Sequence, residues 1–119
     1  MPTPDPQLVY KVATRAAYRD AVKTGTYQGA PIDIQDGFIH FSTAGQLPET
    51  LSKHFAGQQE LVLAAVPTEA LGPALRWEVS RGGALFPHLY APLSLSLVKW
   101  TAEIAVAPDG TCILPEDVR

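Results

Sequence analysis

The run Leu61-Val-Leu-Ala-Ala-Val66 decides the fold expected for this chain. An uninterrupted apolar run of this length is typical of a buried strand at the centre of a sheet. Pro67 ends the run, because proline has no N–H to contribute to a central ladder. The sequence patterns on either side predict which elements surround this strand.

Two helices are predicted before the central strand. Thr14 can cap a helix over residues 15–23, and Thr43 with Gln46 resembles a capping box that begins a second helix over residues 46–55. Strand formers and turn residues predict the remaining elements. Strands are expected at residues 8–12, 38–42, 75–80, 97–106 and 111–114.

The order of these elements indicates an α+β domain, with two helices against a largely antiparallel sheet. Within residues 86–90, Pro87 favours a loop or an edge position over a central strand. Strand alternation separates apolar from polar side chains along the predicted strands. It predicts a core beneath the helices formed by Ile39, Phe41, Leu63, Trp77 and Val79.

Length and composition limit the classes of protein that fit. A chain of 119 residues can form one domain, which we expect over residues 8–119 after a flexible, proline-rich lead-in at residues 1–7. A net charge of −3 without a basic stripe argues against nucleic-acid binding. The single Cys112, the absence of a leader-like start and of an apolar run of roughly 20 residues predict a cytoplasmic protein without a membrane partner.

His40 is the first candidate site residue. Alternation in the predicted strand places Phe38, His40 and Ser42 on one face, opposite Ile39 and Phe41. If the second set faces the core, His40 and Ser42 line a cleft in which a neutral imidazole can donate and accept hydrogen bonds. A structural histidine bonded to a backbone carbonyl is the alternative, and the strand alone leaves both open.

The segment Trp77-Glu-Val-Ser-Arg-Gly-Gly83 is a candidate anion site. Glu78 offers a carboxylate, Arg81 a fork of donors, and Gly82 with Gly83 lets a ligand approach the backbone closely. An exposed ion pair of Glu78 with Arg81 or Arg76 is the alternative, and it would contribute only about 0 to 1 kcal/mol.

The aromatic segment that follows suits a flat ligand. Phe86, His88 and Tyr90 could stack on a ring and hydrogen-bond to it, although packing of an irregular loop would explain them as well. The three histidines show no His-x-His or His-x-x-x-His spacing, so no metal site is predicted.

Two stretches resemble the domain-of-unknown-function family 952. They are Asp36-Gly-Phe-Ile-His-Phe-Ser-Thr43 and Trp77-Glu-Val-Ser-Arg-Gly-Gly-Ala-Leu-Phe-Pro-His-Leu-Tyr90. The resemblance runs from about Tyr10 to Trp100 and leaves residues 101–119 as a C-terminal extension. The family has no established activity. The resemblance implies a split antiparallel sheet similar to that of ADP-ribosylating enzymes, whose cleft holds NAD, although fold alone does not carry function.

The resemblance also implies roles for single residues. His40-Phe41-Ser42 is similar to the element with which some ADP-ribosyl transferases hold the nicotinamide ribose, and Tyr90 to their stacking aromatic. The leading hypothesis is therefore an enzyme of the ADP-ribosyl-transfer type or a relative, in which Arg81 holds phosphate and Glu78 stabilises an oxocarbenium-like transition state. His40, Glu78 and His88 are then the catalytic candidates, with NAD as a candidate substrate.

A non-catalytic module that binds a nucleotide or another anionic metabolite through the same residues is the alternative. A protein-interaction domain, the third interpretation, would need a large exposed apolar patch that the sequence does not locate.

Overall fold

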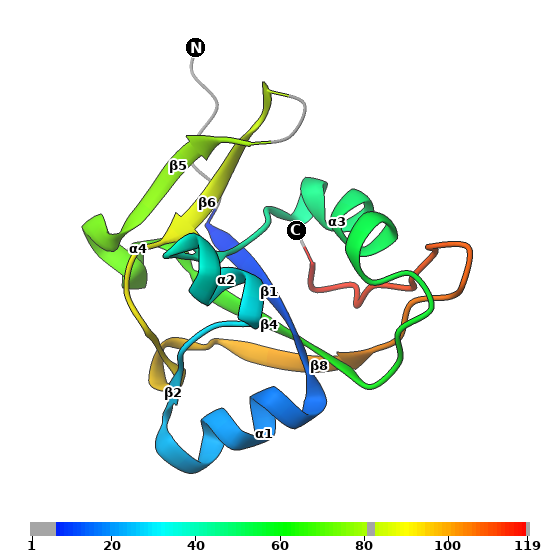
Figure 1. Cartoon of the computed structure of the whole chain (residues 1–119), viewed down its shortest axis with the longest axis horizontal. Helices are drawn as coiled ribbons and strands as arrows, with labels where there is room; N and C mark the ends of the chain where they lie inside the picture. Colours follow the sequence, from blue (N-terminus) through cyan, green and yellow to red (C-terminus); the bar gives the residue numbers. More distant parts are fainter. Residues whose placement is uncertain (1–6, 81–82, 119) are drawn as a thin grey trace.

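A three-stranded antiparallel sheet forms the centre of the molecule (Figure 1). The computed structural model describes residues 7–80 and 83–118, so all of the predicted lead-in except Gln7 lies outside the described residues. The sheet consists of β1 (Leu8–Thr14), β4 (Leu61–Pro67) and β8 (Trp100–Ile104), in the order β1-β4-β8. The apolar run is therefore the central strand, as predicted, and residues 61–66 are all buried.

A second sheet carries the candidate residues. It contains β3 (Ile39–His40), β5 (Leu75–Val79) and β6 (Leu85–Leu89), in the order β3-β6-β5, and a short ladder joins β2 (Thr26–Tyr27) to β7 (Leu93–Ser94). Every pairing is antiparallel. The α+β class is confirmed, with the antiparallel strands divided among three small sheets.

Both predicted helices are present, as α1 (Arg15–Thr24) and α3 (Leu47–His54). The side chain of Thr14 accepts a hydrogen bond from the backbone N–H of Ala17 at 3.1 Å, which caps α1. Two short helices were not predicted, namely α2 (Pro31–Asp36) and α4 (Thr68–Leu71). Short 3₁₀ turns lie at η1 (Ala44–Gln46), η2 (Gly72–Ala74) and η4 (Leu95–Leu97).

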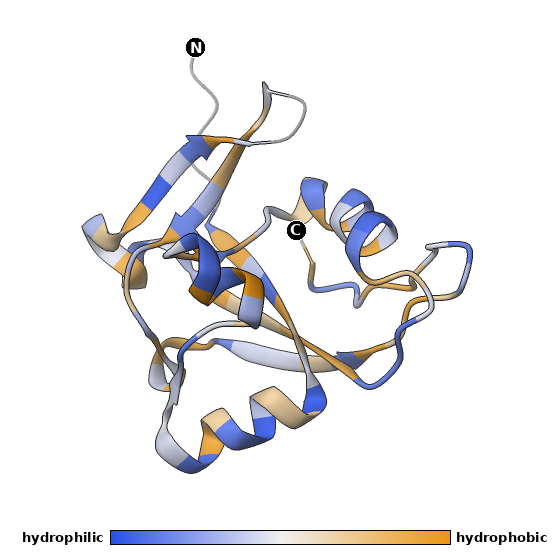
Figure 2. Cartoon of the chain, in the orientation of Figure 1, coloured by the Kyte–Doolittle hydropathy of each residue, from blue (hydrophilic) through white to orange (hydrophobic). Residues whose placement is uncertain are grey.

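Two apolar clusters make up the core. The first cluster contains Ile39, Phe41 and Val9 of β1. The second cluster lies under α3 and contains Leu63 and Tyr10, the residue of β1 that follows Val9. Because neighbouring residues of a strand face opposite ways, the central sheet separates the two clusters. Along α1 and α3, apolar and hydrophilic residues alternate as expected for helices with one buried side (Figure 2).

The predicted core is partly confirmed. Ile39, Phe41 and Leu63 are buried, and Trp77 packs half-buried against the first cluster. Val79 is 69% exposed, so its placement in the core was wrong. The reason is that the β5–β6 hairpin extends away from the body of the molecule, and Val79 lies near its tip (Figure 1).

The prediction that residues 86–90 form a loop or an edge was also wrong. Pro87 lies in β6, the middle strand of its sheet. Its carbonyl accepts a hydrogen bond from the N–H of Phe41 at 2.9 Å, so its backbone faces β3 and the missing N–H does not disturb the ladder with β5. The hydrogen bond that Pro87 cannot donate would go to β3, and β3 has only two residues, so few ladder bonds are affected. Residues 111–114 form no strand.

Candidate functional site

One face of the β3-β6-β5 sheet gathers polar and aromatic side chains, with His88 buried among them. Ile39 pairs with Leu89 and both are buried in the first core cluster, so the next pair, His40 with His88, points to the opposite face. On β5, Arg76 lies opposite His88. Glu78 and Phe86 share this face by the same alternation, and ring contacts place Phe38 and Tyr90 there as well. We call these side chains the ring cluster, which consists of Phe38, His40, Arg76, Glu78, Phe86, His88 and Tyr90.

Phe38 lies at the centre of the ring cluster. Its ring stacks on that of His88, with centroids 4.1 Å apart and planes inclined by 21°. The same ring lies 4.7 Å from His40 and 5.2 Å from Tyr90, while the two imidazoles meet edge to face at 5.3 Å. One phenyl ring therefore fixes the relative positions of the two histidines and the tyrosine.

His40 is held by carboxylates on both sides. Its Nδ1 lies 2.6 Å from Asp33 Oδ1 and its Nε2 lies 3.0 Å from Asp36 Oδ2. A carboxylate only accepts hydrogen bonds, so Nδ1–H donates to Asp33 and a protonated ring can donate to both partners. The side chain of His40 is 34% exposed, whereas that of Asp33 is 1% exposed. His40 thus links the surface to a buried carboxylate.

Asp33 is the buried anchor of this arrangement. It accepts from Lys11 Nζ at 2.8 Å and from the backbone N–H groups of Ala30 and His40 at 2.7 and 3.1 Å. Burial alone would raise the pKa of Asp33, but the His40 hydrogen bond and the Lys11 charge outweigh it and lower the pKa to about 2. Burial lowers the pKa of Lys11, and the charge of Asp33 opposes that effect.

His88 has a different environment. Its Nδ1 lies 2.8 Å from Glu78 Oε1, and the hydroxyl of Tyr90 donates to the same oxygen at 2.7 Å. These bonds from Tyr90 and His88 lower the pKa of the Glu78 carboxyl, and the Glu78 bond raises the pKa of Tyr90. The guanidinium of Arg76 lies 4.9 Å from the centroid of the Tyr90 ring.

The second nitrogen of His88 has no hydrogen-bond partner among residues 7–80 and 83–118. When Nδ1–H donates to Glu78, Nε2 of the neutral ring carries the lone pair. A carboxylate that orients an imidazole in this way makes its far nitrogen a proton acceptor. Glu78 and His88 therefore form a carboxylate–imidazole pair that can move a proton.

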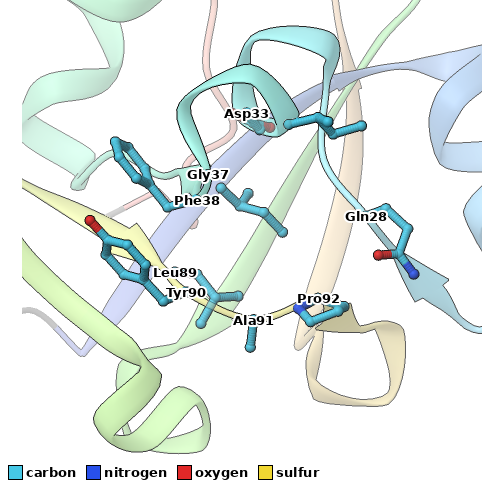
Figure 3. A pocket seen from close by; sticks show the side chains of 10 residues that line it. Gln28, Asp33, Gly37, Phe38, Leu89, Tyr90, Ala91 and Pro92 are labelled. Atoms are coloured by element: carbon cyan, nitrogen blue, oxygen red, sulfur yellow. The ribbon is translucent and has the colours of Figure 1, made fainter.

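A cavity of about 230 Å³ lies next to the ring cluster (Figure 3). Phe38 and Tyr90 lie on one side of it and Gln28 on the other, and Asp33 of α2 also lines it. Leu89, Ala91 and Pro92 form part of its wall. Among the predicted site residues within the described ranges, Tyr90 lines this cavity, and it connects the cavity to the Glu78–His88 pair.

Two other predicted site residues, Ser42 and Gly83, do not belong to the ring cluster. Ser42 does not join the ring cluster, because β3 ends at His40 and Ser42 is buried with its hydroxyl 3.0 Å from Thr50 Oγ1. Gly83 lies in the β5–β6 connection. Arg81 and Gly82, two residues of the predicted anion site, lie outside the described residues.

Sequence reasoning missed Lys11, Asp33, Asp36 and Phe38 as parts of the site. One sequence signal was available, since Lys11 is a charged residue inside a largely apolar strand. In the structure Lys11 is 7% exposed.

Within the described part of the chain, no group of three or more His, Cys, Asp or Glu side chains could hold a metal ion. No helix in that part is long and apolar enough to span a bilayer.

The comparisons with known proteins agree with the quoted signature stretches. A family model described as "Protein of unknown function (DUF952)" matches residues 12–101. The chain belongs to this family. The match contains all members of the ring cluster, and it ends within β8.

Two solved structures of protein CC0527 from Caulobacter crescentus are similar to this DUF952 chain. The crystal structure has 47% sequence identity and a TM-score of 0.85, and covers 89% of this chain and 93% of that one. The solution NMR structure has 48% identity and a TM-score of 0.78, and covers 87% and 90% of the two chains. No curated protein matches this chain.

Proposed function

We propose that this DUF952 domain binds a small molecule with a flat ring beside Phe38 and Tyr90 and transfers a proton through Nε2 of His88. The Glu78–His88–Tyr90 arrangement is the observation that carries this proposal. Glu78 accepts both bonds through one oxygen, so it fixes the imidazole and supports the positive charge that His88 gains when it takes a proton.

The neighbouring cavity supports a ring-bearing ligand. Its volume of about 230 Å³ leaves room for a small ring, and its lining combines the rings of Phe38 and Tyr90 with polar groups of Gln28 and Asp33. A ligand seated there would lie against Phe38 and Tyr90, and these two side chains connect it to His88, on which Phe38 stacks, and to Glu78, which accepts from Tyr90.

A nucleotide such as NAD is the ligand class that the resemblance to ADP-ribosylating enzymes favours. In that version Arg81 and Gly82 bind phosphate and Tyr90 stacks on the base, while His40 stays bonded to Asp33 and Asp36 and only supports the neighbouring rings. Glu78 already accepts hydrogen bonds from His88 and Tyr90, so we assign it a positioning role and give the proton-transfer step to His88.

A non-catalytic module that binds a nucleotide or another anionic metabolite is the second candidate. What favours it is the state of His40, whose two ring nitrogens are both occupied by carboxylates of the same chain. In this version the ring cluster is a preformed wall for the ligand and no proton moves.

A ligand screen on matched variants distinguishes the two functions. Thermal-shift measurements with NAD, ADP-ribose, nucleosides and other flat-ring metabolites identify a ligand, and NMR spectra of the mixture then detect a product. His88→Asn keeps a donor for Glu78 but cannot accept a proton, whereas His54→Asn changes a histidine of α3 outside the ring cluster.

Proton transfer predicts that wild type and His54→Asn form product while His88→Asn binds the ligand without turnover. Binding without product in all three variants would assign the domain to the second candidate. If no compound of the screen raises the melting temperature, both candidates fail.

A further inference from the structure

The outer edge of β5 has unused backbone hydrogen-bonding groups. β5 is the last strand of its sheet and pairs with β6 alone among the described strands. The carbonyl of Ala74 accepts from the N–H of Tyr90 at 2.8 Å, and the N–H of Ser80 donates to Ala84 at 2.9 Å. Even-numbered residues of this segment therefore face β6.

The odd-numbered residues consequently face away from the sheet. The N–H of Leu75 donates to the carbonyl of Gly72, which leaves its own carbonyl directed outward. For Trp77 and Val79, both the N–H and the carbonyl point to the open edge. Proteins commonly protect such edges with proline, with charged side chains or with a bulge. Residues 75–79 contain no proline, and their two charges, Arg76 and Glu78, are of opposite sign and can pair across such an edge.

Two copies of β5 can pair with each other as antiparallel strands, with matching backbone groups and opposite charges. A two-fold axis through Trp77 places Trp77 opposite Trp77 of the partner subunit, in a pair that can exchange both backbone hydrogen bonds. The same register brings the N–H of Val79 to the carbonyl of Leu75 of the partner subunit. It also places Arg76 opposite Glu78 of the partner subunit, on the face that carries the ring cluster.

We propose that a second copy of this chain pairs along the β5 edge in this register and forms a symmetric dimer. Glu78 can accept the partner's Arg76 because the hydrogen bonds from His88 and Tyr90 both go to Oε1 and leave Oε2 available. Val79, which is 69% exposed, would lie within the seam, and Leu85, which is 52% exposed and pairs with Val79, would lie one strand away from it. The dimer brings Arg76 of the partner subunit to the edge of the ring cluster.

Val79→Pro tests the backbone pairing. The N–H of Val79 faces the open edge, so proline there leaves the ladder with β6 intact and removes a bond between subunits. Val79→Ala keeps the N–H and is the matched control. Sedimentation equilibrium from about 10 µM to about 1 mM measures the self-association constant.

We expect the mass of wild type and Val79→Ala to rise from 12.8 kDa toward twice that value with increasing concentration. Val79→Pro should associate at least about tenfold more weakly while its circular dichroism spectrum stays unchanged. A wild type that remains at 12.8 kDa up to about 1 mM would overturn the proposal and leave the edge to a strand of another protein. Equal association of all three variants would also overturn it.

A charge swap tests the register independently. Arg76→Glu places two carboxylates opposite each other and should weaken association, while Arg76→Glu combined with Glu78→Arg restores opposite charges and should recover it. If the double variant associates no better than the single one, a different register or surface holds the dimer.

Discussion

The two histidines of the ring cluster are direct neighbours across β3 and β6, yet their environments differ. His40 lies between two carboxylates and both of its nitrogens are engaged, whereas His88 uses Nδ1 alone and keeps Nε2 available among the described residues. The His40 side rests on the buried Asp33–Lys11 pair, while the Glu78 partner of His88 has a side chain that is 38% exposed. The comparison favours a mainly structural role for His40 with Asp33, and it supports the proposal that Glu78 and His88 carry the chemistry.

The largest expected effect is the loss of Asp33. Asp33→Ala leaves Lys11 buried without its counter-ion and the N–H of Ala30 without its acceptor. Breaking a buried ion pair from one side costs about 3 to 5 kcal/mol, so the free energy of unfolding in urea should fall by that amount. Asp36→Ala, which removes an exposed partner of His40, is the control and should cost under about 1 kcal/mol. Equal losses would remove the distinction between buried and exposed partners.

Low pH should reduce the contribution of Asp33 to the free energy of unfolding. Since the pKa of Asp33 is about 2 in the folded chain and 3.8 without the fold, its contribution to stability is complete above pH 3.8 and is lost as the pH falls toward 2. Urea unfolding of wild type and Asp33→Asn at several pH values measures this loss. The difference between them should shrink in that window, and a constant difference would contradict the assignment.

Removal of His40 should have an intermediate effect. His40→Ala takes a donor from Asp33 but leaves its bond with Lys11, so we expect a loss of about 1 to 3 kcal/mol in the free energy of unfolding. Ligand affinity of the folded variant should remain close to that of wild type. An unchanged melting temperature together with abolished binding would instead make His40 the functional histidine.

The smallest effect is expected at Tyr90. Tyr90→Phe removes the hydroxyl that donates to Glu78, the strongest influence that lowers the pKa of this carboxyl. The pKa of Glu78, followed by carboxyl ¹³C NMR, should rise toward its ordinary value while the fold is preserved. A pKa that does not move would show that Tyr90 and Glu78 are not coupled in solution.

The sequence predicts much of this architecture because hydrophobic periodicity is a local signal. The central strand at residues 61–66 and the two longer helices follow from it, as does the inward direction of Ile39 and Phe41. Helix α2 was missed because a short segment beginning at Pro31 shows little periodicity, although proline is common in the first helical turn.

The site is harder to predict, because its contacts join residues that are distant along the chain. His40 and His88 were candidates, but Asp33 and Lys11 are 22 residues apart and no local pattern pairs them. Pro87 can lie in the middle strand because its backbone faces the short strand β3 and not β5. Which strand lies on each side of β6 is not visible in the local sequence. Tertiary structure alone supplies this information.

The hydrogen position on the His88 ring tests the central claim most directly. Long-range ¹H–¹⁵N NMR spectra of the neutral ring distinguish the two tautomers. The account predicts a hydrogen on Nδ1 in wild type, and a loss of that preference in Glu78→Ala, which removes the acceptor. A neutral ring that carries its hydrogen on Nε2 in wild type would leave no proton acceptor at the site and would contradict the account.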